Sequence, residues 1–221
     1  MKFEASKTLP EQIAKYLEDR IIRREIKSGE RLVETKIAEE LGVSQSPMRE
    51  ALRMLEKVRL VRLTPRHGAR VTELTEDFII SIYDIFQELV GLATQKTVER
   101  RTDKDILDIR ALFEKVRHYS QANDIFNFNE MYFQWGIRCL KAAYDPLLEE
   151  HLIDLVPSIR RLQYISLLKR DSKDIFGIVE KMAYTTDCIE KGLIKEARIN
   201  NCTEVEREKK LVLQIFRQFP E

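Results

Sequence analysis

The 221-residue sequence is poor in the two residues on which tight turns depend, with seven glycines and six prolines. This scarcity argues against a turn-rich β-sandwich and favours long helices. Apolar residues make up 43% of the chain and charged residues 34%, so we expect a folded core and exclude a disordered tail. No apolar run approaches about 18 residues, so the sequence predicts no membrane-spanning helix.

Cysteine and histidine are scarce as well, with three residues of each. The cysteines (Cys139, Cys188 and Cys202) are odd in number and widely spaced, which argues against a secreted disulfide framework. The N-terminal segment is charged through Arg24 and lacks a signal-peptide pattern, so we expect a cytoplasmic protein. Glycine-rich nucleotide-binding motifs, the Gly-x-Ser-x-Gly nucleophile motif and histidine-rich hydrolase signatures are also absent. The sequence therefore predicts no enzyme.

The net charge is only +1, but it is unevenly distributed along the chain. Residues 1–72 carry +5 and residues 73–221 carry −4. The excess is concentrated in residues 44–72, where seven basic side chains stand against two acidic ones. Two halves of opposite sign indicate two tasks, and the basic half is the candidate for a polyanionic partner. By itself, the charge excess is equally consistent with a solvated surface.

Periodic apolar positions in the first sixty residues predict three helices. The first spans residues 9–26, and the second spans about 34–41, where Gly42 ends it. The third spans about 46–57, with the serine at its start as the cap and Pro47 at its first position.

After these helices the pattern changes to alternation of apolar and polar residues. Val61 and Leu63 alternate with Arg62 and Thr64, and the same alternation covers residues 69–71. The intervening Pro-Arg-His-Gly sequence indicates a turn. We therefore expect a β-hairpin of two short strands.

Two short helices joined by a glycine turn and followed by a basic hairpin predict a winged helix-turn-helix domain over residues 1–73. The second helix of such a pair inserts its N-terminal end into the major groove, and a narrow basic hairpin can enter a minor groove. Serine hydroxyls suit phosphates, Gln45 suits adenine, and Arg49 suits guanine or phosphate. The predicted DNA-binding residues are Ser44, Gln45, Ser46, Arg49, Arg53, Arg66, His67 and Gly68.

Residues 42–52, Gly-Val-Ser-Gln-Ser-Pro-Met-Arg-Glu-Ala-Leu, resemble the recognition segment of the GntR family of bacterial transcription regulators. That family usually reads Gly-Val-Ser-Arg-Thr-Pro-Val-Arg-Glu-Ala-Leu. Residues 29–34 and 37–41 before this segment and 63–71 after it also fit, so the resemblance covers roughly residues 9–72. It implies a homodimer that binds a palindromic DNA operator, most commonly as a repressor.

One residue of the recognition segment departs from the family pattern. Gln45 stands where the family usually has arginine, and by the resemblance that position reads a base that is commonly guanine. Because glutamine pairs preferentially with adenine, we predict an operator that differs from the family's common one at this base pair.

Beyond Thr75 the pattern is helical throughout, so we expect a mainly α fold with an all-helical domain over residues 74–221 and a hinge near residues 73–76. Polar starts and short breaks separate about six helices, expected at residues 75–100, 103–120, 124–142, 146–168, 172–190 and 193–218. The domain resembles the FadR-like branch of the family, with local support at residues 129–134 and 142–148. The FCD-type C-terminal domain of that branch is a helical bundle that binds a small effector and dimerises.

The metal site usual in that branch, built from one aspartate and three histidines, is not kept in this sequence. By the resemblance, Glu130 and Gln134 stand at the aspartate and first histidine positions, and Met182 and Glu204 near the other two. Only two histidines lie in the C-terminal half, which excludes a three-histidine site. We expect no metal and no cofactor, and an oxygen-ligand site is left open.

The effector pocket implied by the resemblance has also lost charge. Family members often carry arginine and glutamate on the first bundle helix, where this sequence has Phe86 and Val90. A more apolar lining favours an apolar or neutral ligand over a metal-chelating carboxylate. The alternative is that these residues are core and the pocket has shrunk or is lost. The candidate pocket residues are Phe86, Val90, Glu130, Gln134, Arg138, Arg161, Met182 and Glu204.

Tyr132 and Trp135 are further candidates for a cavity wall, although aromatic residues at helical spacing more often belong to a core. Taken together, the sequence predicts a sequence-specific DNA-binding transcription regulator whose operator binding is modulated by a small-molecule effector. The alternative keeps the DNA reader but makes the helical domain a purely structural dimerisation domain without metal or ligand.

Overall fold

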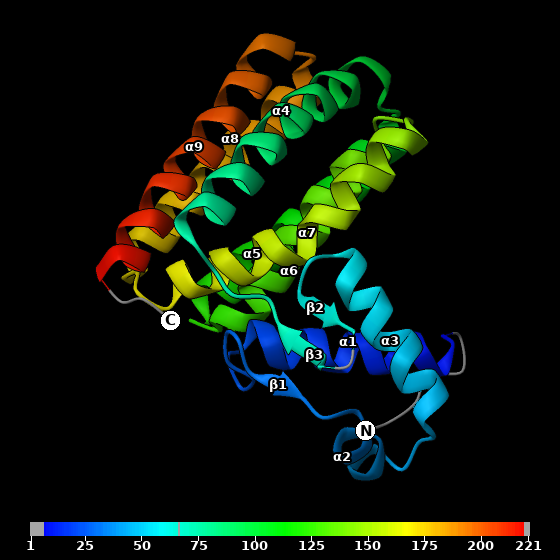
Figure 1. Cartoon of the computed structure of the whole chain (residues 1–221). Coiled ribbons are helices and arrows are strands. Elements are labelled where there is room, and N and C mark those ends of the chain that lie inside the picture. The colour runs from blue at the N-terminus through cyan, green and yellow to red at the C-terminus, as the bar shows by residue number, and fades with distance from the viewer. Residues whose placement is uncertain (1–6, 66, 219–221) are drawn as a thin grey trace. The chain divides into compact units, whose positions relative to one another are not determined.

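The computed structural model describes residues 7–65 and 67–218 (Figure 1). Their contacts divide the chain into two compact units, one up to Thr75 and one from Glu76 onward. The described residues are mainly helical, as expected from the sequence. Within these ranges, none of the helices combines the length and the apolarity that crossing a membrane requires.

The N-terminal unit combines three helices with a small antiparallel sheet, whose strand order is β1-β3-β2. Ala69 of the central strand pairs with Leu32 on one side and with Leu63 on the other. The predicted helix-turn-helix and hairpin are therefore present. The elements are α1 (Leu9–Ile22), β1 (Arg31–Leu32), α2 (Glu34–Leu41), α3 (Gln45–Lys57), β2 (Val61–Thr64) and β3 (Gly68–Val71).

Helices α1 and α3 supply most of the core of this unit. Ile13, Leu17 and Ile21 recur at four-residue spacing on α1 and are buried, because they share one helix face. They pack in one cluster with Met48 and Leu52 of α3. Burying one such side chain contributes about 1.5–3 kcal/mol, so the apolar faces account for the packing of the two helices.

Two helix boundaries differ from the sequence prediction. Helix α1 ends at Ile22 rather than near Ile26, because Arg24 adopts a left-handed backbone conformation with φ of 64°. Ile26 is nevertheless buried in the core, so its apolar spacing made the predicted helix too long. Helix α3 begins at Gln45, which leaves Pro47 as its third residue. Proline is tolerated there because the first-turn N–H groups have no partner within the helix.

The C-terminal unit consists of helices in its described part, and each of them overlaps one of the six predicted ranges to within about two residues. Helix α4 packs along α9 and α5 packs along α6, while α8 contacts both α5 and α9. Figure 1 shows the pairing of α4 with α9 in particular. The helices are α4 (Glu76–Arg100), α5 (Asp103–Gln121), α6 (Ile125–Lys141), α7 (Pro146–Leu167), α8 (Ser172–Lys191) and α9 (Ile194–Gln218).

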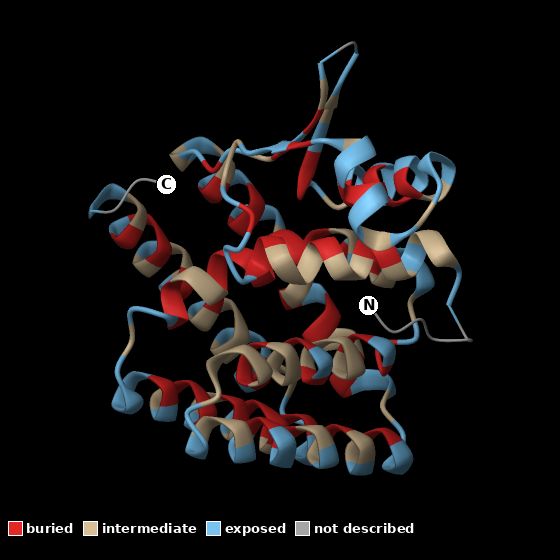
Figure 2. Cartoon of the chain, turned by 90° about the horizontal axis from the view of Figure 1, so that it is seen from below, coloured by how far each residue is buried: buried red, intermediate tan, exposed pale blue. Residues whose placement is uncertain are grey.

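The polar residues between these helices set their starts. Asp124, Asp145 and Asp171 each accept a hydrogen bond from a backbone N–H of the first turn that follows. Thr102 caps α5 in the same way, through the backbone N–H of Asp105. Such caps satisfy donors that a helix start otherwise leaves unpaired, which is why these residues mark the boundaries so well. Figure 2 shows buried and exposed residues on opposite faces of several helices, whereas residues 157–163 of α7 are all buried.

Candidate DNA interface and internal cavity

The turn between α2 and α3 depends on Gly42. This residue has a φ of 66°, in the left-handed region that favours glycine. Its N–H donates to the carbonyl oxygen of Glu39 at 3.1 Å, and the N–H of Val43 donates to that of Ala38 at 2.9 Å. These bonds close the end of α2, so that α3 starts three residues after Gly42.

The start of α3 presents polar side chains to solvent. Met48, Ala51, Leu52 and Leu55 anchor the helix in the core. The side chain of Ser44 makes no capping hydrogen bond. The arrangement leaves the predicted contact residues of α3 exposed: Ser44, Gln45, Ser46, Arg49 and Arg53.

Arg49 is held in place by two neighbours. Its Nε lies 3.0 Å from Oε2 of Glu34 on α2, and its Nη2 donates to Oε1 of Gln45 at 3.4 Å. The Arg49 side chain is still 62% exposed, so part of its guanidinium remains available to a partner. Glu34 thus orients a predicted DNA contact. Sequence reasoning did not single it out, because its pairing with Arg49 spans 15 residues and crosses the turn.

The hairpin formed by β2 and β3 carries basic residues on both strands. Arg62 and Arg70 pair across the two strands and are both exposed. At the tip, His67 is exposed and its N–H donates to the carbonyl oxygen of Thr64 at 3.0 Å. Gly68 has a φ of 82°, which makes the tight return of the chain possible.

Figure 2 shows that the hairpin extends away from the helices of its own unit. A projecting strand pair with basic side chains has the shape and charge needed to reach a nucleic-acid groove beside α3. The predicted contact Arg66 lies outside the described residues.

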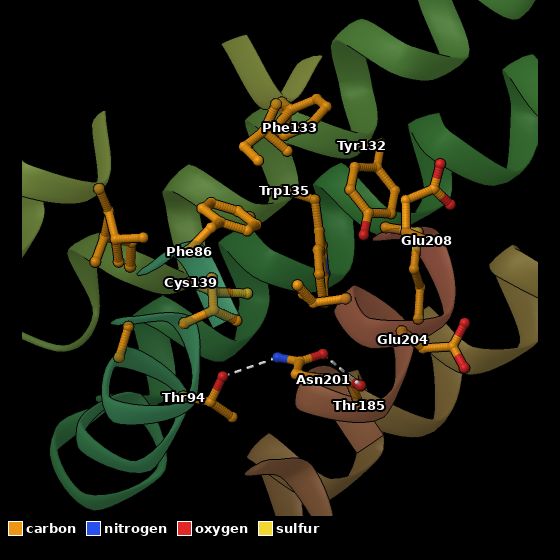
Figure 3. A pocket seen from close by; sticks show the side chains of 18 of the residues that line it. Phe86, Thr94, Tyr132, Phe133, Trp135, Cys139, Thr185, Asn201, Glu204 and Glu208 are labelled. Carbon is orange, nitrogen blue, oxygen red and sulfur yellow. Dashed lines mark hydrogen bonds between the residues drawn. The ribbon is translucent and has the colours of Figure 1, made fainter. Parts of the chain in front are cut away.

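The C-terminal unit contains a cavity of about 120 Å³. It is lined by residues of α4, α6, α7, α8 and α9. On one side the wall is aromatic, with Phe86 from α4 and Tyr132 and Trp135 from α6 (Figure 3). The helical spacing of these aromatic residues is typical of a packed core. In this unit they instead form the wall of the cavity.

The opposite side of the cavity is a hydrogen-bonded group centred on Asn201 of α9 (Figure 3). Its Nδ2 donates to Oγ1 of Thr94 on α4 at 2.8 Å, and its Oδ1 accepts from Oγ1 of Thr185 on α8 at 3.1 Å. The neighbouring Asn200 donates to Oγ1 of Thr185 at 2.7 Å. One asparagine pair thus ties three helices together beside the cavity.

Charged residues of the cavity wall are paired. Nζ of Lys181 lies 2.6 Å from Oε1 of Glu204, and Arg207 contacts the other oxygen of the same carboxylate. The Glu204 side chain is 15% exposed whereas that of Lys181 is 44% exposed, so the negative group lies deeper than the positive one. Glu208 accepts hydrogen bonds from Ser166 and from Arg170.

The pKa of Tyr132 reflects the burial and the negative charge of this wall. Burial, followed by the negative charges of Glu208 and Glu204, raises the pKa of Tyr132 to about 12. The phenol therefore stays protonated at neutral pH. The interior of the cavity is an unfavourable place for an additional negative charge.

The structure brings together half of the predicted pocket residues, since Phe86, Val90, Met182 and Glu204 line the cavity. The other four lie elsewhere in the unit. Glu130 pairs with Arg160 and accepts from Nε2 of Gln134, and Arg138 bonds to Asp105 and Asp108. Arg161 is buried within α7.

The residues at the family's metal positions do not fit a metal ion. Glu130 and Gln134 lie apart from the cavity that Met182 and Glu204 line, so the four side chains do not converge. Among the described residues, no group of three or more histidine, cysteine, aspartate or glutamate side chains is arranged to hold a metal. We derive no metal-dependent step for this protein.

Several cavity residues were not singled out by the sequence analysis, among them Tyr83, Gln163 and Glu208. Their types and spacing are ordinary for helices. A usable signal was present at Asn200 and Asn201, because two consecutive asparagines are costly inside a helix unless their side chains have a specific role.

The comparisons with known proteins agree with this arrangement. The family model described as bacterial regulatory proteins, gntR family, matches residues 9–71, which include α2, α3 and the hairpin. The gluconate operon transcriptional repressor of Bacillus licheniformis is 31% identical over 173 residues, covering 76% of this chain and 70% of the relative. The HTH-type transcriptional regulator YdhC of Bacillus subtilis, itself uncharacterized, is 28% identical over 190 residues, or 81% and 85% of the two chains.

Solved structures share the fold across nearly the whole chain. The structure of E. coli McbR/YncC superposes with a TM-score of 0.81 at 20% identity, covering 96% of this chain and 99% of the other. A putative GntR transcriptional regulator from Rhodococcus sp. RHA1 gives a TM-score of 0.76 at 18% identity, with coverage of 93% and 97%. The family model, these relatives and the arrangement of α2, α3 and the hairpin lead to one conclusion. The chain belongs to the GntR family of bacterial regulatory proteins and is a transcription regulator with a helix-turn-helix DNA-binding unit.

Proposed function

We propose that this regulator represses transcription by binding a palindromic DNA operator as a homodimer, and that a small molecule in the helical unit changes that binding. The observation that carries the proposal is the start of α3. There the exposed side chains of Ser44, Gln45 and Arg49 stand on a helix whose opposite face is locked into the core. Residues 1–73 are the DNA-binding part, with Ser46, Arg53, Arg66, His67 and Gly68 as further contacts.

The proposal of a palindromic operator and of a homodimer follows from the size of the DNA-binding domain. One winged domain reads only half of a symmetric site, so two copies are needed to read both halves. The repressor assignment is supported by the name of a relative, the gluconate operon transcriptional repressor. We assign dimerisation and effector binding to residues 74–221, as in the FCD-type domains of the FadR-like branch. We place the protein in the cytoplasm, together with its DNA.

Effector control is supported by the cavity. A purely structural bundle gains stability by filling its interior, whereas this one keeps an internal space beside polar side chains. For an effector to act, it must bind two arrangements of the dimer with different affinities.

The test is a selection of binding sites from random duplex DNA with the purified full chain at two salt concentrations. We expect a short inverted repeat, with affinity that falls steeply as salt rises because bound counterions are released. Arg49→Ala should weaken binding to the selected site at least about tenfold, since a good side-chain contact to a base contributes about 1–3 kcal/mol.

Arg117→Ala is the matched control, because it removes the same charge from an exposed position on α5. It should leave binding unchanged within about twofold. Recovery of sequence-blind binding that Arg49→Ala does not weaken would overturn the DNA-reading role of α3.

A further inference from the structure

Three buried polar atoms in the cavity wall have no hydrogen-bond partner among the described residues. They are the hydroxyl of Tyr83, the indole Nε1 of Trp135 and the amide oxygen of Gln163. The residues that carry them are 1%, 5% and 4% exposed, so water at the surface does not satisfy them. An unpaired buried polar group costs about 1–3 kcal/mol of stability. Buried polar groups are normally hydrogen-bonded, so three unpaired ones in the wall of one cavity require an explanation.

The residues that carry these atoms line the same cavity as Tyr132. The rings of Tyr132 and Trp135 lie 6.5 Å apart, and Gln163 is hydrogen-bonded to the Tyr132 hydroxyl. Tyr132 is also close enough to Tyr83 to raise the pKa of its phenol, after burial and Glu208. Because Tyr83, Trp135 and Gln163 all line this one cavity, a molecule bound in it lies against the residues that carry the unpaired atoms.

The unpaired atoms define the polar group that such a molecule must carry. Trp135 offers an N–H donor, Gln163 offers an acceptor oxygen, and the Tyr83 hydroxyl can act in either sense. A hydroxyl group fits this set because it accepts one hydrogen bond and donates another. A hydrocarbon leaves all three atoms unpaired.

The charges of the wall argue against an ionised ligand. Glu204 and Glu208 line the cavity, and each is already bonded to a cationic side chain. The carboxylate of a ligand would thus lie near two carboxylates of the wall, whose cationic partners are already engaged in ion pairs. The ammonium group of a ligand would have to compete with these cationic partners for the two carboxylates.

The volume limits the size of the ligand. The cavity of about 120 Å³ is close to the roughly 150 Å³ of an apolar cavity that takes benzene. Its wall includes Phe86 and Trp135, whose flat faces suit a ring.

We infer that the cavity binds an uncharged, ring-sized molecule that carries one hydroxyl group, through Trp135, Tyr83 and Gln163. This inference rests on the proposed function for its biological meaning, because the ligand is then the effector. The binding itself is a property of the helical unit and is tested without DNA.

The probes are benzyl alcohol, toluene and benzoate, which share a ring and differ in the group attached to it. Binding to the full chain is measured by calorimetric titration and by the fluorescence of Trp135, which is the only tryptophan in the sequence. We expect benzyl alcohol to bind and to change the fluorescence, toluene to bind about fivefold or more weakly, and benzoate to bind weakest, since each lost hydrogen bond costs about 0.5–1.5 kcal/mol.

Trp135→Phe keeps a six-membered aromatic ring and removes the five-membered ring that carries the N–H donor. It should weaken benzyl alcohol about fivefold and leave toluene unchanged, with calorimetry as the readout. Tyr83→Phe should also weaken benzyl alcohol. Because it removes an unpaired buried hydroxyl, it should leave the melting temperature of the free protein unchanged or higher. A purely structural hydroxyl would instead lower it.

The inference is overturned if benzyl alcohol does not bind, or if benzoate binds at least as tightly as benzyl alcohol. It is also overturned if Trp135→Phe weakens the binding of benzyl alcohol and of toluene equally. Benzyl alcohol binding that leaves operator affinity unchanged supports the cavity chemistry and contradicts only the proposed effector role. Absence of operator binding in the selection experiment contradicts the DNA-binding proposal and leaves the titrations unaffected.

Discussion

The two units place their polar side chains in opposite ways. In the N-terminal unit the buried residues described are apolar, and the charged side chains of α3 and the hairpin stand at the surface. The buried polar residues of the described chain lie in the helical unit instead, for example Thr94, Gln163 and Thr185. Buried polar groups cost free energy unless they are paired. The N-terminal unit thus has its polar side chains outside its core, whereas the helical unit buries part of its polar side chains within the core.

The largest expected effect tests whether the two cores are independent. Leu52→Ala should destabilise the N-terminal unit by about 3 kcal/mol, because Leu52 is fully buried and a cavity replaces it. Hydrogen exchange followed by mass spectrometry should show faster exchange in residues 9–71 and little change in 76–218. Leu162→Ala, at an equally buried position of α7, should give the reverse. Equal acceleration in both units would contradict the separation.

The next effect tests the charged network that supports the helical unit. Asp105 is buried and accepts hydrogen bonds from the Thr102 backbone, Arg138 and the Tyr144 hydroxyl. Burial opposes ionisation, but these bonds outweigh it and hold the pKa of Asp105 well below its usual range. Asp105→Asn should destabilise this unit by about 2 kcal/mol at neutral pH.

The pH dependence of that effect has a definite sign. A carboxyl whose pKa is lower in the folded state stabilises the protein above its unfolded pKa, near 3.8, and loses this contribution as pH falls toward the folded pKa. The stability difference between the natural chain and Asp105→Asn, measured by denaturant unfolding, should therefore be constant above about pH 5 and shrink below about pH 4. A difference that does not change between these conditions would contradict the role given to the ionised carboxylate.

A smaller effect concerns specificity at the surface of the N-terminal unit. Gln45→Arg should shift the preferred base at one operator position from adenine toward guanine, by about 1–2 kcal/mol of discrimination. Site selection with the variant and with the natural chain measures the shift. An unchanged preference would remove Gln45 from the set of base-reading residues.

The smallest effect concerns the residue that orients Arg49. Glu34→Gln removes the ion pair and one negative charge beside α3, so affinity for duplex DNA should rise about twofold while discrimination between sites falls. Glu40→Gln changes the same charge at an exposed position of the same helix and serves as the control. Identical behaviour of the two variants would mean that the ion pair has no orienting role.

The sequence predicted the helical scaffold closely because the signals were local. Aspartates and a threonine at helix starts both mark and cause the boundaries of α5 to α8. The start of α3 was placed two residues too late, because both Ser44 and Ser46 precede Pro47 and either is a suitable cap. Strand β1 was not predicted, since two residues show no periodicity and the strand depends on pairing with β3 across the chain.

The cavity was less predictable because it depends on side-chain direction. Glu130 and Gln134 were selected because the resemblance places them at the metal-ligand positions of the family, and both lie with Arg138 on one face of α6. The cavity is lined by another face of that helix, which carries Tyr132 and Trp135. Only the packing of α6 against its neighbours decides which face is internal, and no local pattern reports that choice.

Asn201 has a mechanical consequence that follows from the length of α4. Thr94, to which Asn201 donates, lies 18 residues from the start of α4 at Glu76, where the N-terminal unit joins. At 1.5 Å per residue, this separation is about 27 Å along a stiff rod. Each degree by which α4 tilts about Thr94 therefore displaces its first residue by about 0.5 Å. The hydrogen bond from Asn201 thus fixes α4 to α9 about 27 Å along the helix from the residue at which the N-terminal unit ends.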